Sequence, residues 1–223
     1  MAGMNQEEYI LQNLGIAVAS FGKIQTFIDY GNVDRWFDKD TAPFLGKIIE
    51  NNEKISISIE KLGKFVDIFS QKKHFYYGFY PDRPASLHIK VLADKTAKFV
   101  TVTKPVQKIK HYLNVNDKID KNHYQVNQDL KGSYIYVYKC NFDVEMTIDA
   151  IRLAEHYDTV AVFTSGRDFI ALLKHLKNLG KKIILFYSGP TASELKELAN
   201  VKINGQQIRE LIGELKKKNS ATL

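Results

Sequence analysis

Residues 139–169 read KCNFDVEMTIDAIRLAEHYDTVAVFTSGRDF, and this stretch decides the class of the fold. Its apolar residues at 144, 148, 151 and 154 have helical spacing, which predicts a helix over Val144–Tyr157. The continuous apolar run Thr159–Thr164 is typical of a strand that is buried on both faces. A second helix over Phe169–Leu179 and a second buried strand over Lys182–Tyr187 follow. This alternation predicts an α/β fold with a mostly parallel central sheet.

The rest of the chain continues the alternation on both sides. Further strands are predicted at Lys23–Asp29, Lys73–Tyr80 and Phe99–Lys104. Further helices are predicted at Thr41–Glu53 with its neighbours, at Ser86–Ala93, at Glu194–Ala199 with a cap at Thr191 or Ser193, and at Gln206–Lys218. The polar segment from about Lys110 to Lys139 breaks the rhythm, and we interpret it as an inserted β-hairpin with a strand at Tyr134–Tyr138.

Composition narrows the classes of protein to consider. The 223 residues include 44% hydrophobic residues, enough for a sizeable core, and 32 Lys+Arg against 25 Asp+Glu, a net charge of 32 − 25 = +7. Nine Lys and four Asp from Lys90 to Lys131 place 9 − 4 = +5 in that segment. A positive excess favours an acidic partner, with nucleic acid first. The single cysteine, Cys140, excludes an internal disulfide and a Cys-rich zinc site, and it fits a reducing compartment.

No segment has the features of a signal peptide or of a membrane span. The chain begins MAGMNQEEYI, with two acids where a signal peptide has basic residues. The longest apolar runs are far shorter than the ~20 residues that cross a bilayer. We therefore expect a cytoplasmic protein without a membrane partner.

Acidic residues follow three of the predicted strands or begin the helices after them. Asp29 closes the first strand, Asp143 precedes a helix, and Asp168 follows the strand Thr159–Thr164. Because open parallel sheets place ligands at the carboxyl ends of their strands, we expect these acids to converge on one pocket. Oxygen ligands with few His or Cys suit Mg²⁺ or Mn²⁺, and such a metal can assist phosphoryl transfer.

Each acid also has a purely structural alternative, and the residues alone leave both open. Asp143 could be only the N-cap of the helix that follows, and Asp29 with Tyr-Gly-Asn could be only a turn signal. Asp168 could only complement a helix dipole. Asp149 lies six residues after Asp143, about 600° of helical rotation, so it is as well explained as a solvated helix acid.

Two blocks of motifs resemble the NYN domains, which have a PIN-like nuclease fold. FIDYGN (27–32) is similar to the first family motif, an apolar strand followed by Asp and, three positions later, Asn, here Asp29 and Asn32. The stretch 139–169 resembles the central block, with Asp143 and Asp149 at its two acids and Asp168-Phe169 at its final Asp-Phe. LLKHLKNLGKKIILF (172–186) and SELKELANVKI (193–203) are similar to the segments that follow. The chain looks closest to the bacterial and archaeal uncharacterised branch.

The resemblance implies a three-layer α/β/α sandwich and Mg²⁺- or Mn²⁺-dependent cleavage of RNA. It covers residues 23–205 outside the insertion at about 110–139, which leaves 1–22 as an N-terminal extension and 206–223 as a C-terminal helix and basic tail. In this reading the catalytic and metal-holding acids are Asp29, Asp143 and Asp168, with Asp149 as a weaker ligand. Asn32 and Ser165 would contact water or phosphate, although Ser165 could equally be a turn serine.

One position departs from the family pattern. Gly166-Arg167 stands where the family has an acid before the final Asp-Phe, so one carboxylate is lost and a cation is gained. Arg167 could bind a substrate phosphate instead. The departure motivates two hypotheses: a metal-dependent endoribonuclease, or a degenerate NYN domain that binds RNA or a protein without cutting.

Basic and aromatic residues near the insertion could complete an RNA path. Lys104, Lys108 and Lys110 could contact phosphates, and tyrosines such as Tyr112, Tyr124 and Tyr134 could stack on unpaired bases. Solvated lysines and tyrosines packed in a sheet are the structural alternatives. An exposed hairpin edge at Tyr134–Tyr138 could also pair with a second copy in a homodimer.

Overall fold

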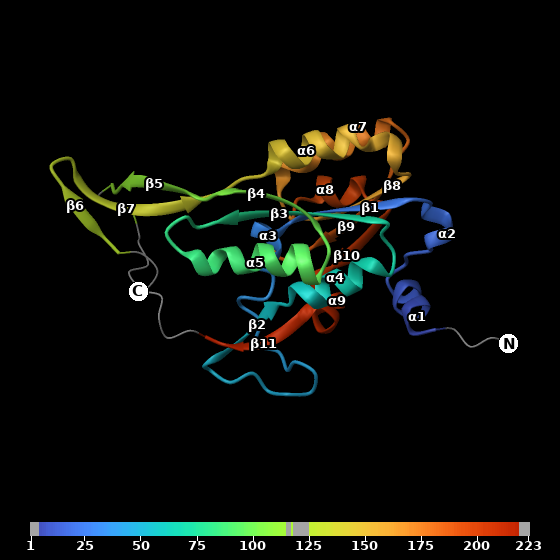
Figure 1. The fold of residues 1–223 in the computed structure, drawn as a ribbon, viewed down its shortest axis with the longest axis horizontal. Helices are drawn as coiled ribbons and strands as arrows, with labels where there is room; N and C mark the ends of the chain where they lie inside the picture. Colours follow the sequence, from blue (N-terminus) through green and yellow to red (C-terminus); the bar gives the residue numbers. More distant parts are fainter. Residues whose placement is uncertain (1–4, 115–116, 118–124, 219–223) are drawn as a thin grey trace.

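A six-stranded parallel sheet forms the centre of the protein (Figure 1). The computed structural model describes residues 5–114, 117 and 125–218. The strand order is β10-β9-β8-β1-β3-β4, and every neighbouring pair in this sheet is parallel. The strands are β1 (Ile24–Asp29), β3 (Lys72–Phe79), β4 (Val100–Pro105), β8 (Thr159–Phe163), β9 (Lys182–Tyr187) and β10 (Val201–Asn204). The α/β class and all five of the predicted parallel strands are confirmed.

Helices cover both faces of this sheet and complete three layers. In Figure 1, α6 (Asp143–Arg152), α7 (Ile170–Asn178) and α8 (Ser193–Leu198) lie on one side, and α4 (Ile59–Asp67), α5 (Leu87–Val91) and α9 (Gly205–Ile212) lie on the other. Alternate residues of β8 face the two layers: Val160 and Val162 belong to one core cluster, while Ala161 and Phe163 belong to the other. A continuous apolar strand is required because both of its faces are buried.

The N-terminal and C-terminal segments also contribute to the core. Helices α1 (Gln6–Asn13) and α2 (Val18–Phe21) precede β1, and Leu11 and Phe21 are buried in the same cluster as β1. From the other end of the chain, Ile208 and Ile212 of α9 are fully buried there. Among the described residues, no helix is long and apolar enough to cross a membrane.

The predicted helix over Thr41–Glu53 was wrong. Residues 41–52 form a loop, which leads into β2 (Glu53–Ile57) after the short helix α3 (Tyr30–Val33). Leu45 and Gly46 both have positive φ, 50° and 77°, a conformation that no helix contains. The buried Arg209 side chain holds this loop, since it pairs with Asp40 at 3.0 Å and donates to the backbone carbonyls of Ala42 and Pro43.

The predicted helix over Gln206–Lys218 was right only in its first half. Helix α9 ends at Ile212, and β11 (Gly213–Lys217) then pairs antiparallel with β2. A Cβ at Gly213 would lie 2.6 Å from the carbonyl oxygen of Arg209, so this turn out of the helix requires glycine. The predicted cap of α8 was also wrong, because its N-cap is Ala192 and no side chain caps it.

The insertion is a three-stranded antiparallel sheet, which we call the arm. Its strands are β5 (Gln107–Tyr112), β6 (Asn127–Asp129) and β7 (Gly132–Lys139), in the order β5-β7-β6. The predicted strand Tyr134–Tyr138 lies within β7, but the arm has one strand more than the predicted hairpin. The arm extends away from the layered body in Figure 1. Tyr124 lies outside the described residues.

Candidate functional site

The carboxyl ends of β1 and β8 form the point where the sheet changes direction. From β1 the chain proceeds to β3 and β4 on one side, and from β8 it proceeds to β9 and β10 on the other. Ligands in open α/β sheets bind at such a switch point. Asp29 is the last residue of β1, and residues 164–168 follow β8 directly. The fold therefore places two of the three predicted acids at the expected position.

Asp29 is a partly buried carboxylate, and among the described residues no cation compensates its charge. The Thr164 hydroxyl donates to its Oδ2 at 3.2 Å, and the backbone N–H of Gly166 donates to the same hydroxyl at 3.1 Å. Burial raises the pKa of Asp29 from 3.8 to about 6; the Thr164 hydrogen bond opposes this rise, and the charge of Asp143 adds to it. No lysine or arginine of the described part of the chain contributes to this pKa.

Asp143 lies between the other two acids. It is the first residue of α6, whose N-cap is Phe142, so the capping interpretation of Asp143 was wrong. The Asn141 side chain accepts from the backbone N–H of Asp143 and donates to its Oδ2, both at 2.6 Å. Burial raises the pKa of Asp143 and the neighbouring carboxylate of Asp168 raises it further, while Asn141 opposes the rise. The three acids are thus a row in which each repels the next.

Asn32 connects the segment that follows β1 with the loop that follows β8. Its Oδ1 accepts from the backbone N–H of Ser165 at 3.1 Å and from Nε1 of Trp36 at 3.0 Å. Ser165 Oγ in turn donates to the Ser188 carbonyl at 2.7 Å. Among the described hydrogen bonds, none uses the Nδ2 amide of Asn32. Asn32 therefore positions the loop after β8 with its oxygen and keeps its amide donor for a ligand.

Asp149 lies apart from the row of acids. Its Oδ2 accepts from the buried Tyr76 hydroxyl at 2.9 Å, and its Oδ1 pairs with Arg152 at 2.8 Å. Both oxygens have partners, Tyr76 on β3 and Arg152 on the same helix as Asp149. This geometry supports a structural role for Asp149.

The predicted substrate-binding cations occupy three different places. Lys104, near the end of β4, pairs with Glu145 of α6 at 2.5 Å and lies close enough to Asp143 to lower its pKa. Lys108 and Lys110 lie on β5 of the arm. Arg167 is exposed at the entrance to α7. Of these cations, the structure brings only Lys104 into electrostatic contact with the acids, as judged from the groups that act on their pKa values.

Sequence reasoning missed Thr164 and Asn141, which touch the acids directly. Both residues are adjacent to motif positions, but a threonine at a strand end and an asparagine before a helix are common without any ligand. The pairing of Lys104 with Glu145 was missed for a different reason, since it joins residues 41 positions apart. Trp36, which donates to Asn32, packs on Phe163 with 6.1 Å between ring centroids.

The donor set fits a divalent cation, although the acids do not form a closed cage. Within residues 5–114, 117 and 125–218, no group of three or more His, Cys, Asp and Glu side chains is placed to hold a metal. Mg²⁺ needs no such cage, because it is usually held by one or two carboxylates and keeps several waters. Asp29 and Asp143 are oxygen donors with raised pKa values, and the charge of Asp143 contributes to the rise at Asp29, so they fit that requirement.

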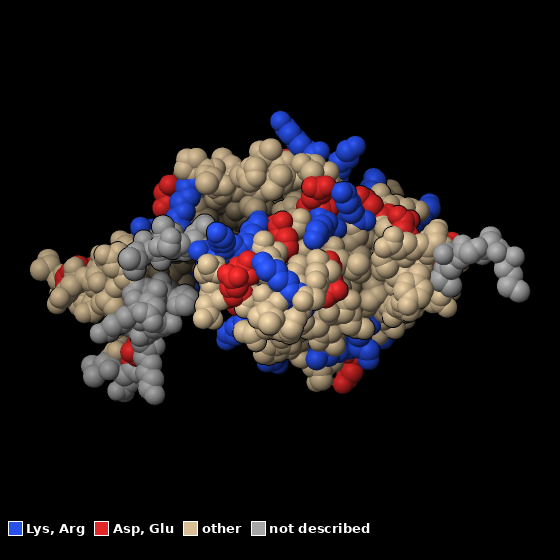
Figure 2. Space-filling model, turned by 90° about the horizontal axis from the view of Figure 1, so that it is seen from below, with Lys and Arg blue, Asp and Glu red and all other residues tan. Residues whose placement is uncertain are grey.

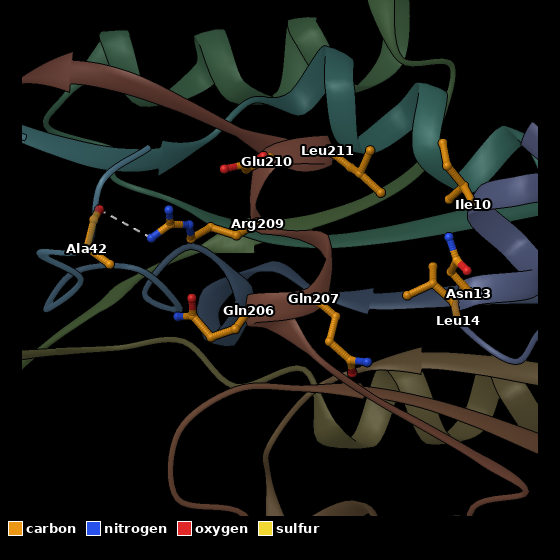
Figure 3. A pocket seen from close by; sticks show the side chains of 9 residues that line it. All are labelled: Ile10, Asn13, Leu14, Ala42, Gln206, Gln207, Arg209, Glu210 and Leu211. Carbon is orange, nitrogen blue, oxygen red and sulfur yellow. Dashed lines mark hydrogen bonds between the residues drawn. The ribbon is translucent and has the colours of Figure 1, made fainter. Parts of the chain in front are cut away.

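On the face in Figure 2, lysines and arginines lie among acids and form no continuous positive patch. Several lysines of the body are paired with acids, such as Lys47 with Glu53 and Lys64 with Glu60. A separate pocket of about 510 Å³ lies between α1 and α9, and Figure 3 shows Arg209 hydrogen-bonded to Ala42 within it. None of the three acids lines this pocket.

The chain is thus a three-layer α/β protein with a row of carboxylates at the point where its parallel sheet changes direction. The NYN domain profile matches residues 3–204, and the chain belongs to this family. NYN domains are part of the PIN-like nuclease superfamily, which supports a nuclease-type function and the general use of divalent metals. The matched range includes most of the segment that we had interpreted as an N-terminal extension.

A solved structure has the same fold. It is the crystal structure of a protein of unknown function from Vibrio parahaemolyticus, with a TM-score of 0.55 and 16% sequence identity. The match covers 86% of this chain and 96% of that chain. At this identity the likeness establishes the fold alone. A comparison with curated proteins gave no significant match.

Proposed function

We propose that the protein is a metal-dependent endoribonuclease that hydrolyses RNA phosphodiester bonds. The observation that carries this proposal is Asp29, a partly buried carboxylate whose pKa is raised by burial and by the charge of Asp143, with no lysine or arginine of the described residues lowering it. Burying such a charge is costly, and a fold retains it where a cation binds. Family membership supports the nuclease class, and the choice of RNA rests on the resemblance to NYN domains.

Each residue of the site has a distinct task in this proposal. Asp29 and Asp143 hold Mg²⁺ or Mn²⁺, and Asp168 adds negative charge at the exposed end of the row. When bound, the cation activates water and neutralises charge on the phosphoryl group. Thr164 orients Asp29 through its hydroxyl, and Asn141 orients Asp143.

Donors around the acids complete the phosphate site. The free Nδ2 amide of Asn32 and the exposed guanidinium of Arg167 donate to phosphate oxygens, and Ser165 shapes the loop between them. Lys104 stands beside Asp143 and supplies a positive charge for the RNA backbone. Lys108 and Lys110 would contact further phosphates of the same RNA backbone along the arm.

A binding-only NYN domain is the second candidate. Its support is the replacement of a family acid by Gly166-Arg167, together with the lack of a closed three-ligand cage among the described side chains. Two further properties stay predictions. The exposed strand β5 of the arm motivates the prediction of a homodimer, and the single free cysteine, Cys140, motivates the prediction of a cytoplasmic location.

An RNA cleavage assay tests the two candidates. The wild type is incubated with end-labelled single-stranded RNA and Mn²⁺ or Mg²⁺, with and without a chelator, beside Asp29→Asn. Asp82→Asn, which removes an exposed acid in the loop after β3, is the matched control. Internal cuts that require metal and disappear only in Asp29→Asn support the nuclease. If the wild type and Asp29→Asn give the same products, the nuclease proposal fails.

A further inference from the structure

One face of the arm carries a ladder of tyrosines and lysines, which we call the tyrosine face. The register pairs Lys108 with Tyr138, Lys110 with Tyr136, and Tyr112 with Tyr134. Directly opposed residues of an antiparallel pair point to the same side, so these six side chains share one face. The opposite face carries no tyrosine: its residues are Gln107, Ile109 and His111 of β5 and Ser133, Ile135, Val137 and Lys139 of β7.

Cation–π contacts organise the tyrosine face. The Lys108 ammonium lies 4.1 Å from the centre of the Tyr136 ring, and the Lys110 ammonium lies 3.8 Å from that of Tyr134. The Tyr134 ring also makes edge contacts with Tyr112 and Tyr136, at 5.8 and 5.4 Å between centroids. The rings are therefore held in a row along β7 with the two ammonium groups above them. Lys110 is also paired with Asp129, whose carboxylate accepts a hydrogen bond from the Tyr112 hydroxyl at 2.9 Å.

The row continues onto the body of the protein. Tyr80, just after β3, meets Tyr138 at 5.4 Å between ring centroids. The Arg83 guanidinium lies over both rings, at 5.2 and 5.8 Å. From Tyr138 the chain reaches Asp143 in five residues, which span at most about 17 Å. A strand lying on the tyrosine face would thus be led toward the row of acids.

Core packing does not explain these tyrosines. Neither of the two core clusters includes a residue of the arm. All six residues of β5 are exposed, Tyr112 keeps 37% of its surface accessible, and Tyr134, Tyr136 and Tyr138 of β7 are half-buried. Side chains two positions apart on a strand are about 6.6 Å apart, which lets Tyr134, Tyr136 and Tyr138 serve as separate stacking positions.

We propose that the tyrosine face binds single-stranded RNA, with unpaired bases stacked on Tyr112, Tyr134 and Tyr136 and phosphates held by Lys108 and Lys110. The identity of the nucleic acid rests on the proposed function; the preference for single strands rests on the face itself. Bases of a duplex are already stacked on one another and cannot present their faces to the rings. The lysines now above the rings are long and flexible, so they can move aside to the backbone.

Binding is measured by fluorescence anisotropy in chelator, where metal-dependent cleavage cannot occur. The probes are a labelled oligouridine of about 12 nucleotides and a labelled RNA duplex of the same length. We expect Tyr134→Ala and Tyr136→Ala each to weaken binding of the oligouridine by about 5-fold to 150-fold, as for loss of one stacked base. Replacing Lys108 or Lys110 with Gln should reduce the log–log salt slope by about 0.7 each.

Two controls separate stacking from loss of the fold. Tyr134→Phe keeps the ring and should bind within about twofold of the wild type. Ile109→Ala alters the opposite face of β5, between the two lysines, and should also bind within about twofold.

Three outcomes overturn the proposal: equal binding by Tyr134→Ala and the wild type, equal affinity for duplex and oligouridine, or tyrosine variants that change only self-association. Because the assay excludes cleavage, its failure is distinct from failure of the nuclease. A protein that does not cleave RNA could still bind it through the tyrosine face. Binding that does not depend on the tyrosines would leave the cleavage result unaffected.

Discussion

Replacing Asp29 with Asn should stabilise the protein while removing a ligand of the proposed metal site. The folded carboxyl has a pKa of about 6 against 3.8 in the unfolded chain, so the folded state binds this proton more tightly. The free energy of unfolding of the wild type therefore falls as the pH rises from about 4 to about 6. The pKa difference corresponds to about 3 kcal/mol, at about 1.4 kcal/mol per pH unit.

Asparagine carries no such penalty, because it is neutral and nearly isosteric with aspartate. Its Oδ1 can still accept from the Thr164 hydroxyl. Without metal and near pH 7.5, we expect Asp29→Asn to gain about 1–3 kcal/mol. For a chain of this length the gain is a rise in Tm of about 3–10 °C. Near pH 4 the gain should vanish, since wild-type Asp29 is then protonated in the folded state.

Thermal unfolding across this pH range, with and without Mg²⁺, is the assay. A ligand at 100 times its Kd stabilises by about 2.7 kcal/mol, and only the wild type should show this gain. Asp82→Asn controls for the loss of one negative charge at an exposed position. The reasoning is refuted if Asp29→Asn is no more stable than the wild type near pH 7.5, or if its advantage is equally large near pH 4.

Three further substitutions test neighbouring parts of the structure. Asp149→Ala leaves the buried Tyr76 hydroxyl without its acceptor and should cost about 1–3 kcal/mol in urea unfolding, whereas Asp149→Asn should cost less; equal costs would contradict the hydrogen-bond argument. Gly166→Asp should fold normally, because φ is −71° and the nearest atom to a new Cβ lies at 3.4 Å, and it should raise Mn²⁺ affinity several-fold by calorimetry; unchanged affinity would argue against a lost ligand. Arg209→Ala removes the cation beside the partly buried Asp40 and the donor to the loop carbonyls, and should cost about 1–3 kcal/mol by denaturant unfolding; a loss under about 0.5 kcal/mol would show that the 41–52 loop stands without it.

Local patterns predicted the sheet because a strand that is buried on both faces has a continuously apolar sequence. The runs at Thr159–Thr164 and Lys182–Tyr187 are continuously apolar, and both became central strands. The convergence of Asp29, Asp143 and Asp168 was also predictable, since the carboxyl ends of parallel strands meet at one edge. For these features the residue types alone carry the information.

Elsewhere, contacts between distant residues overruled local preference. Thr41–Glu53 has an amphipathic pattern, but Arg209, far along the chain, holds its first part as a loop. Gly213–Lys217 continues a helical pattern, yet it pairs with β2 because Gly213 lets the chain turn beside Ile55. The sequence cannot show either outcome, because each depends on a partner more than 150 positions away.

The sequence by itself determined the α/β class, five of the six parallel strands, with β10 missed, and the three acids of the candidate site. Only the tertiary structure decided that Asp149 turns to Tyr76, that Thr164 supports Asp29, and that the tyrosines of the arm share one face with its lysines. The physical reason is the separation along the chain of the residues that interact. Burial and strand ends are local properties of a segment, whereas a hydrogen-bond partner or a strand register exists only when distant segments meet.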